Sequence, residues 1–566
     1  MSSSSRIAVL LRVVLLPLGL IGATVAGLGS YFEANDDMAL AWLFSGVIAA
    51  KPVASVPLYF HGYGHVLSAA YAAQPAVPWF GLLLGVGLSV ATVLVFAVLD
   101  HWLRARWRGV AGVGALVLFF GLAWLEHWLW FSYVRVGLLL AGAGMLFAAQ
   151  RPGRRGPLAV GLAVLLAAWL MRPSLAMMGF GAALPAAWWL AGSWRRAAPV
   201  LLGGATVLAL ATAVATFQQT PTEAHTQARD RYFARILDFD QLQPQPRSTA
   251  DSLGTAAVSL WLMGDSTLVN EALCQRAYRF DAPNFYGREV PAKLRVRAGL
   301  LVRDYFPVLL ALGATALAVW RQRKRNVAVD FWLVQAAYVG ALAFLAGVLK
   351  LPPRLELPLL DFWLLANLIY VRRPAAAGRG DIPGPVAAER TFPLWWLRGA
   401  ALLACGTVAL YGVKTWHRHQ VLSAERRRHE AALSVLRRRG AGAVRIVAGP
   451  NDFLKSLSPF RAYAVGPGPV LLLSGWPSHD ASQTRLRRAL SGTADQTECL
   501  RRLARLPTYS APPRALWVLT PETARWLARR FRFDGAPMLL YPEGAPLAND
   551  TALAARVYHI QPWPEH

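Results

Sequence analysis

The sequence contains few charged residues and few cysteines. Only 16% of the 566 residues are charged, whereas 55% are hydrophobic, and the mean hydropathy is +0.37. The apolar residues stand in runs long enough to cross a bilayer. This composition excludes an ordinary soluble enzyme and predicts an α-helical polytopic membrane protein. The three cysteines, Cys274, Cys405 and Cys499, have no metal-binding or redox spacing.

The apolar runs predict about eleven membrane spans. The first run is long and leads directly into polar sequence of functional character. We therefore interpret it as a retained span and not as a cleaved signal peptide. The predicted spans lie near residues 7–29, 79–99, 110–130, 132–150, 157–171, 174–192, 199–217, 305–320, 328–349, 357–371 and 393–413.

Basic residues in short loops stay on the cytoplasmic side of a membrane, and here they fall in alternate connections. The basic clusters lie at residues 104–108, 151–155, 195–196, 321–325 and 372–379. This alternation places the N-terminus inside the cell and segments 30–78 and 218–304 outside. An odd number of spans places the tail outside as well. Cys274 and Cys499 then share the outer side, but a disulfide between them cannot be assigned from the sequence.

The tail differs in character from the segment that carries the predicted spans. Its short apolar runs alternate with helical patterns, which is typical of a small α/β domain. Strands are predicted at VRIVAG (444–449), PVLLLSGW (469–476), ALWVLT (515–520) and PMLLYP (537–542), and a helix at ETARWLARRF (522–531). The tail is long enough to bury its own core. We therefore predict a transmembrane domain of residues 1–413 and an extracytoplasmic α/β domain of residues 414–566.

The formal net charge is +27, and the cytoplasmic loops explain only part of it. The tail adds the basic runs ERRRHE (425–430) and LRRRG (436–440). A basic surface outside the cell favours membrane lipids or acidic glycans as partners, and no nucleic acid is expected there. Alternatively, these runs are solvated helix faces, as charge runs usually are.

An acidic pair, Asp36 and Asp37, stands at the exit of the first span in YFEANDDMAL (31–40). One interpretation is structural: Asn35 or Asp36 is the N-cap of a helix that begins near Met38, and the helix dipole favours the second carboxylate. The other interpretation is catalytic. Partial desolvation at the membrane edge raises the pKa of a carboxyl group, which suits it to proton abstraction.

The stretch after the acidic pair is too interrupted by proline and glycine to cross the membrane. We expect it to form interfacial helices that roof a cavity on the outer face. It carries Lys51, His61, His65 and Tyr63, which suit a phosphate and a sugar ring. Ordinary interface polarity explains the two histidines equally well. A metal site at these histidines lacks a clear third ligand.

Arg172, Lys350 and Arg354 lie near outer span ends. A charge at such a place is costly unless it reaches the interface or has a partner, so these side chains either snorkel or bind a phosphate. A second polar group near the outer face contains Glu126, His127 and Arg135. A pair between its glutamate and arginine explains this group as well as a contact with substrate does.

Several motifs accompany the acidic pair. HGYGH (61–65) is followed by Tyr71, Pro75 and Trp79, in the spacing Y-x-x-x-P-x-x-x-W at the start of the second span. Further motifs are MRPS (171–174), KLPPRLELP (350–358), RILDFD (235–240) and SLWLMGD (259–265). Together they resemble the GT-C superfamily of polytopic glycosyltransferases, and more closely a group of poorly characterised bacterial members. The resemblance covers most of the predicted transmembrane domain.

This resemblance implies a GT-C-like fold in the bacterial plasma (inner) membrane. It also implies transfer of a sugar from a polyprenyl-phosphate carrier to a cell-envelope glycan or lipid acceptor, on the outer face and with inversion at the anomeric carbon. In such a reaction Asp37 is the expected base, and Asp36 orients substrate or a bound ion. The three cations near the span ends are expected to stabilise the departing phosphate.

The sequence lacks a second acidic motif, such as D-x-E in a later outer loop, which the best understood members of that superfamily carry. No cofactor is therefore certain, a divalent cation stays an option, and metal ligands are unknown. Two other classes of membrane protein are alternatives to a glycosyltransferase. A transporter needs a polar pathway through the bilayer, which the nearly charge-free spans do not offer. A non-catalytic receptor, with the tail as its working part, would leave the two aspartates as helix caps.

Overall fold

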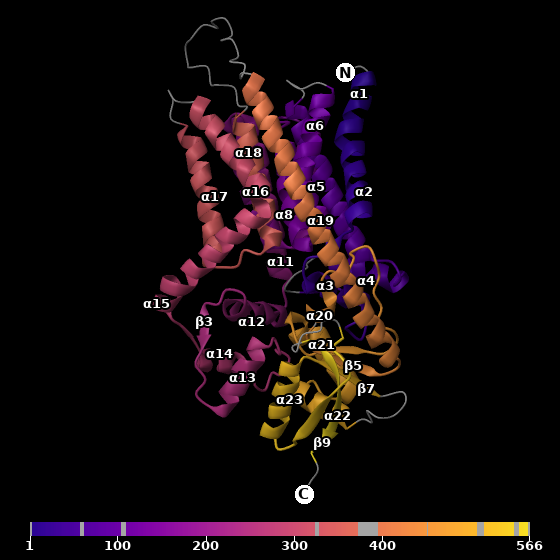
Figure 1. Cartoon of the computed structure of the whole chain (residues 1–566). Coiled ribbons are helices and arrows are strands. Elements are labelled where there is room, and N and C mark those ends of the chain that lie inside the picture. The colour runs from indigo at the N-terminus through magenta and orange to yellow at the C-terminus, as the bar shows by residue number, and fades with distance from the viewer. Residues whose placement is uncertain are drawn as a thin grey trace, which may run out of the picture.

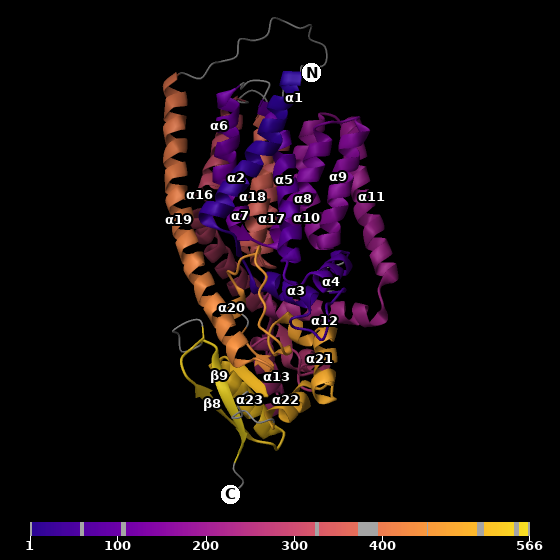
Figure 2. The same ribbon diagram turned by 90° about the vertical axis from the view of Figure 1, so that its right-hand side faces the viewer.

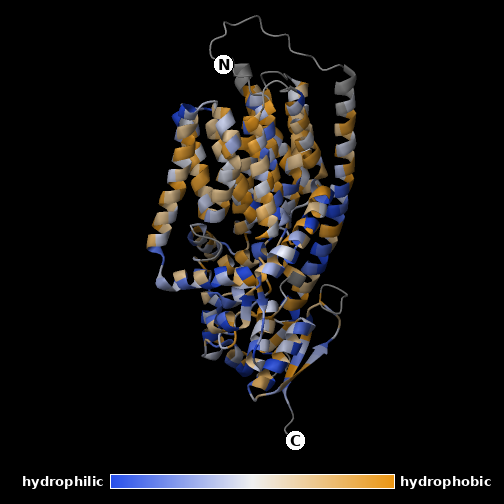
Figure 3. Ribbon diagram, turned by 90° about the vertical axis from the view of Figure 1, so that its left-hand side faces the viewer, coloured by the Kyte–Doolittle hydropathy of each residue, from blue (hydrophilic) through white to orange (hydrophobic). Residues whose placement is uncertain are grey.

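The computed structural model of the chain describes residues 3–56, 62–103, 109–322, 328–371, 394–449, 451–505, 514–547 and 554–563. Long helices run side by side through one half of the molecule, and shorter helices and a small sheet form the other half (Figure 1). Apolar residues line the long helices, and hydrophilic residues are concentrated in the other half (Figure 3). The N-terminus lies at the free end of the helices, and the C-terminus lies at the opposite end of the molecule.

The described residues include seven helical segments that are long and apolar enough to span a membrane. They are Ile7–Leu28, Trp79–Leu103, Val110–Leu129, Pro173–Ala191, Trp194–Gln218, Ala282–Arg321 and Val329–Gly347. Two shorter apolar helices, Tyr133–Ala149 and Arg155–Met171, lie among them. These helices indicate a membrane protein. The count of eleven spans remains a prediction.

The helices of this half follow the predicted spans closely. They are α1 (Ser3–Leu10), α2 (Leu16–Leu28), α5 (Trp79–Leu103), α6 (Val110–Phe119), α7 (Leu125–Leu129), α8 (Tyr133–Ala149), α9 (Arg155–Met171), α10 (Pro173–Ala191), α11 (Trp194–Gln218), α15 (Ala282–Asn284), α16 (Val290–Gln322), α17 (Val329–Gly347), α18 (Pro353–Val371) and α19 (Leu394–Arg439). Short π-helical turns at Leu11–Leu15, Phe120–Trp124 and Phe285–Glu289 join neighbouring helices into longer rods.

The chain reverses between the predicted spans 110–130 and 132–150, after α7 and the short strand β2 (Trp130–Phe131). One connection differs from the prediction. Helix α16 begins well before the predicted span and is kinked at Tyr305, which has non-helical angles of φ −126° and ψ 26°. Pro307 lies just beyond the kink and cannot donate a helical hydrogen bond. The predicted span 305–320 therefore begins at the kink.

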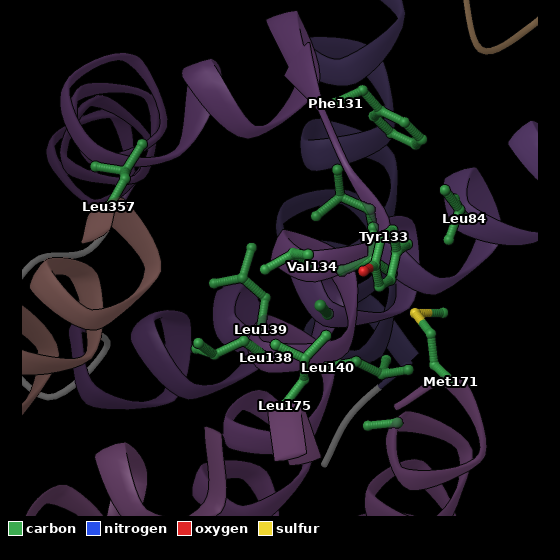
Figure 4. Close-up of a cluster of buried hydrophobic side chains, with 14 of the residues drawn as sticks. Leu84, Phe131, Tyr133, Val134, Leu138, Leu139, Leu140, Met171, Leu175 and Leu357 are labelled. Atoms are coloured by element: carbon green, nitrogen blue, oxygen red, sulfur yellow. The ribbon is translucent and has the colours of Figure 1, made fainter. Parts of the chain in front are cut away.

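Helix α8 lies at the centre of the bundle. Every residue of α8 except Phe147 is buried, and it packs against α5, α9, α10 and α18. Apart from Arg135, its residues are almost all apolar, as expected for a helix in such a place. The contact with α10 is close, because a Cβ on Gly179 would lie 2.2 Å from the carbonyl oxygen of Leu138. Figure 4 shows the cluster of aliphatic side chains around Leu138, Leu139 and Leu140.

The C-terminal domain contains a five-stranded sheet with the order β6-β5-β7-β9-β8. Its strands are β5 (Val444–Val447), β6 (Val470–Leu472), β7 (Ala515–Leu519), β8 (Met538–Glu543) and β9 (Arg556–Pro562), and its helices are α20 (Asn451–Leu454), α21 (Ala481–Ser491), α22 (Gln496–Ala504) and α23 (Pro521–Phe533). Strand β5 pairs in parallel with β6 and β7, whereas β9 is antiparallel to β7 and β8. The predicted strands and α23 are present, and β9 was not predicted.

Helix α19 passes the predicted domain boundary without a break. It runs from the free end of the bundle to the C-terminal domain (Figure 2), so the boundary at residues 413 and 414 lies inside a helix. Both basic runs of the tail belong to the last turns of α19. Arg437, Arg438 and Arg439 are exposed there, as expected for a solvated helix end.

The segment 218–304 contributes to the core of the C-terminal domain. Its elements are α12 (Pro221–Leu237), β3 (Leu242–Pro244), α13 (Thr249–Ser259), α14 (Glu271–Ala277) and β4 (Tyr278–Phe280). Asp265 of this segment accepts a hydrogen bond from Arg530 at 2.8 Å, and the indole of Trp526 donates to the Leu253 carbonyl at 3.0 Å. The two segments therefore share one apolar core.

Cys274 and Cys499 are buried in that core, and each has a free thiol. The disulfide that the sequence left open is therefore not formed in this structure. Cys405 is also free and is exposed on α19.

Candidate functional site

The acidic pair lies in the first turn of α3 (Asn35–Ser45). The N-cap is Ala34, an extended residue at φ −130° and ψ 156° that makes no side-chain cap. The prediction that Asn35 or Asp36 caps a helix beginning near Met38 is therefore wrong. The strand just before the helix, β1 (Tyr31–Phe32), is held on two sides, by β2 and by backbone hydrogen bonds to Leu457 and Ser456.

Helix α3 is enclosed by protein. All of its residues from Asp37 to Phe44 are buried, and it lies between the bundle and the C-terminal domain (Figure 1). The indole of Trp42 donates to the Tyr463 carbonyl at 3.0 Å, and the side chain of Gln483 donates to the Ile48 carbonyl. Helix α4 (Tyr63–Ala73) has the exposed apolar surface expected of an interfacial helix, with Val66 66% exposed.

The Asp37 carboxylate is fully buried. Its Oδ1 accepts hydrogen bonds from the backbone N–H of Tyr133 at 2.9 Å and from the Ser132 hydroxyl at 3.3 Å. Its Oδ2 has no hydrogen-bond partner among the described residues. Burial raises the pKa of Asp37 to about 8, although the Tyr133 hydrogen bond and the nearby Arg354 both lower it. The group is therefore poised to exchange a proton near neutral pH.

The Asp36 carboxylate points to different partners. It accepts a hydrogen bond from the indole N–H of Trp476 at 3.1 Å, and its Oδ2 lies 3.5 Å from the guanidinium of Arg354. The Asp36 and Arg354 side chains are 19% and 23% exposed. The two neighbouring carboxylates therefore differ in solvent exposure: Asp37 is fully buried, and Asp36 is partly exposed.

Tyr133 connects Arg172 to the acidic pair. Its backbone N–H donates to Asp37, and its hydroxyl accepts a hydrogen bond of 2.9 Å from the Arg172 guanidinium. Arg172 stands at the break between α9 and α10, and Arg354 stands in the first turn of α18. The ends of several helices thus bring both arginines to the same place as the aspartates.

The other predicted binding residues are Lys350, Lys51, His65, Tyr63 and His61. Lys350 forms an ion pair with Asp238 at 2.6 Å. Lys51 and His65 are exposed, and neither pairs with Asp36 or Asp37 in the described part of the chain. Tyr63 is half-buried in the first turn of α4. His61 lies outside the described residues.

The described residues contain no group of three or more His, Cys, Asp and Glu side chains that could hold a metal ion. Asp36 and Asp37 accept their hydrogen bonds from different partners. The option of a divalent cation therefore gains no support from these side chains.

The second polar group forms two ionic networks, and the predicted pair between Glu126 and Arg135 is wrong. Arg135 instead pairs with Glu33 at 2.8 Å and contacts His127 Nδ1 at 3.2 Å. His127 Nε2 lies 2.7 Å from Asp361. Glu33 stands three residues before Asp36, so this buried network holds the segment that carries the acidic pair.

Glu126 belongs to the other network. It lies 3.0 Å from Lys414 and 2.8 Å from Arg418, both on α19. Glu126 therefore has its ion-pair partners on α19, whereas the ion-pair partner of Arg135 is Glu33. The network ties α19, the helix that leads into the C-terminal domain, to the bundle.

Sequence reasoning did not find Ser132, Tyr133 or Trp476. Ser132 is the N-cap of α8 and accepts a hydrogen bond from Val134 at 3.3 Å. A serine directly before an apolar run is a recognisable N-cap signal, so this residue was detectable. No comparable local signal marks Trp476, which reaches Asp36 from a distant part of the chain.

Comparison with known proteins found no similar protein: no family model, no curated protein and no solved structure matches this chain. The assignment of a function therefore depends on the geometry of the site and on the motifs in the sequence.

Proposed function

We propose that the protein is a membrane glycosyltransferase of the GT-C type, which transfers a sugar from a polyprenyl-phosphate carrier to a cell-envelope glycan or lipid acceptor. The observation that supports this most strongly is the Asp37 carboxylate. It is buried, one of its oxygens is free of any described partner, and its pKa is about 8. Arg354 lies near it, and Arg172 is linked to it through Tyr133.

In the proposed reaction, Asp37 takes the proton of the acceptor hydroxyl. The acceptor oxygen forms a bond to the anomeric carbon, while the bond from that carbon to the carrier phosphate breaks, with inversion. The polyprenyl phosphate leaves with the bonding electrons, and the proton remains on Asp37. A general base and fixed cations at the developing charge are what such a transfer requires.

Arg354 and Arg172 are the proposed phosphate-binding residues. Arg354 lies near Asp37 and forms an ion pair with an Asp36 oxygen. Arg172 donates to the hydroxyl of Tyr133, the residue whose backbone N–H holds Asp37. Asp36 orients Arg354 through their ion pair. Lys350, which pairs with Asp238, has no such position and is left out of the phosphate site.

Arg354→Gln and Arg172→Gln are expected to lower the rate of transfer from a polyprenyl-phosphate sugar by roughly 10²–10³-fold each. The physical reason is the loss of a fixed positive charge at the departing phosphate. Folded protein is expected to fall much less, because the Asp36–Arg354 pair is partly exposed and such pairs contribute little stability. Steady-state kinetics with varied donor measure the effect.

Arg461→Gln is the matched control, since Arg461 is 62% exposed and pairs with Glu430 away from the site. It should retain wild-type kinetics. Unchanged donor kinetics in both Arg354→Gln and Arg172→Gln would remove these arginines from the phosphate site.

The proposed reaction requires the acidic pair and the C-terminal domain to face the outside of the cell. The alternating basic clusters support this orientation and a cytoplasmic N-terminus. A reporter enzyme that works only in the periplasm is expected to be active when it is fused after His566. A fluorescent reporter that works only in the cytoplasm is expected to be inactive at the same place. A fusion active only in the cytoplasm would overturn the proposed orientation in the inner membrane.

A non-catalytic receptor is the second candidate, and one observation favours it. Asp37 accepts a hydrogen bond from Tyr133 N, the first helical residue of α8, so it also anchors a helix end. In that case its role is structural, and no sugar transfer takes place.

A further inference from the structure

We propose that a small hollow beside Asp36 binds a sugar ring of the acceptor. This inference rests on the proposed function and names the place where the acceptor is held. The hollow is shallow, open to solvent on one side, and lies between α12 and the segment around residue 476. It is lined by aromatic and titratable side chains, among them Phe233, Trp261, Trp476, Asp230, Asp238 and His479.

His479 provides a buried polar group in this hollow. Its side chain is 6% exposed, and its Nε2 lies 2.8 Å from Asp230. Its Nδ1 is buried and has no hydrogen-bond partner within the described ranges. Buried polar atoms nearly always find a partner, because an unmade hydrogen bond is costly. A sugar hydroxyl, which both donates and accepts, would satisfy this nitrogen.

Trp261 is held in an uncommon backbone conformation at the wall of the hollow. Its φ of 59° lies in the left-handed region, and its carbonyl accepts a hydrogen bond from Gly475 at 2.9 Å. A bulky aromatic residue rarely adopts this conformation, and strained residues of this kind gather at functional sites. Flat aromatic surfaces next to a few placed polar groups are the common lining of small-molecule sites.

Trp476 connects the hollow to the acidic pair. It lines the hollow, and its indole N–H donates to Asp36 at 3.1 Å. Asp238, which also lines the hollow, forms an ion pair with Lys350. This pair places Lys350 beside the proposed acceptor and not beside the donor phosphate. The rest of a glycan whose sugar ring is bound in the hollow would therefore extend toward Asp36 and Asp37.

Disaccharides of glucose, galactose, mannose and arabinose, in α and β linkage, are suitable probes. We expect at least one to bind purified full-length protein, with its affinity measured by ligand-observed NMR in detergent. Trp261→Ala and His479→Gln should each weaken this binding roughly tenfold or more. Trp563→Ala is the matched control, because Trp563 is a 43% exposed tryptophan of the same domain outside the hollow, and it should bind as the wild type does.

Asp37→Asn separates this inference from the proposed function. Binding that persists in Asp37→Asn and is lost in Trp261→Ala supports the hollow as a sugar site, even if the wild type transfers no sugar. The inference is overturned if no probe binds the wild type up to roughly 10 mM, or if folded Trp261→Ala and His479→Gln both bind with wild-type affinity. His479→Gln keeps the site testable if Trp261→Ala fails to fold.

Discussion

Asp37→Asn is expected to reduce sugar transfer by roughly two to four orders of magnitude, the usual loss when a general base is removed. Asparagine keeps an oxygen that accepts the Tyr133 hydrogen bond, so the anchor of α8 is preserved. Asp36→Asn should reduce transfer less, because Asp36 acts through Arg354 and keeps an acceptor for Trp476. Rates of purified variants with a polyprenyl-phosphate sugar measure both effects.

The stability of Asp37→Asn distinguishes loss of chemistry from loss of fold. The folded-state pKa of Asp37 is raised to about 8, so between the unfolded pKa and pH 8 the folded chain binds one proton more than the unfolded chain. The contribution of this group to stability therefore falls as pH rises through that window and levels off above it. Asparagine resembles the protonated form, so at pH 8 to 9 the variant should melt at or above the wild-type temperature. An inactive variant that melts far below wild type would contradict the assignment.

The same pKa predicts the pH dependence of the reaction. A base must be ionised, so transfer by the wild type is expected to rise with pH and to reach a plateau above about 8. At lower pH the rate should fall by about tenfold per unit, as the ionised fraction of a single carboxyl group does. A rate that does not change between pH 6 and pH 9, with chemistry limiting, would exclude Asp37 as the base.

Arg135→Ala is expected to lower the free energy of unfolding by about 3–5 kcal/mol, because it leaves an uncompensated charge in a buried network. Arg135 is fully buried and pairs with Glu33, whose side chain is 4% exposed. His127 and Asp361, which continue this network, are fully buried as well. Reversible unfolding of the purified protein in mixed detergent micelles measures the loss.

Glu33→Gln combined with Arg135→Met should recover part of this stability, since replacing a buried ion pair by groups that leave no isolated charge is often nearly neutral. Arg303→Ala is the matched control, because Arg303 is 69% exposed, and a change within about 0.5 kcal/mol is expected there. A loss below about 1 kcal/mol in Arg135→Ala would show that water reaches this network.

The helices of the bundle were predictable because each apolar run is a local signal. The strands β5 to β8 were predictable for the same reason, since each is a short apolar run bounded by turn residues. Asp36, Asp37, Arg172 and Arg354 were selected because charge at the end of an apolar run is costly without a partner. The structure brings Arg354 to both aspartates, and it brings Arg172 to Tyr133, which holds Asp37.

The partners of these residues were not predictable, because they depend on long-range packing. Trp476 reaches Asp36 across most of the chain, and Tyr133 acts through its backbone N–H, for which a sequence pattern carries no signal. Arg135 was assigned to the nearest glutamate in the sequence, whereas its partner is Glu33. The choice among several buried carboxylates is made by helix packing, which the pattern of apolar residues does not specify.

The most direct test of the proposed transfer is to compare wild type with the Asp36→Asn/Asp37→Asn double variant in liposomes. Both proteins are supplied with a panel of polyprenyl-phosphate sugars and with cell-envelope glycans, and the release of polyprenyl phosphate is measured. The wild type is expected to release it from at least one donor, with the sugar recovered on the glycan, and the folded double variant is expected to release none above background. Equal release by both proteins, or no release by the wild type from any donor, would contradict the proposed function.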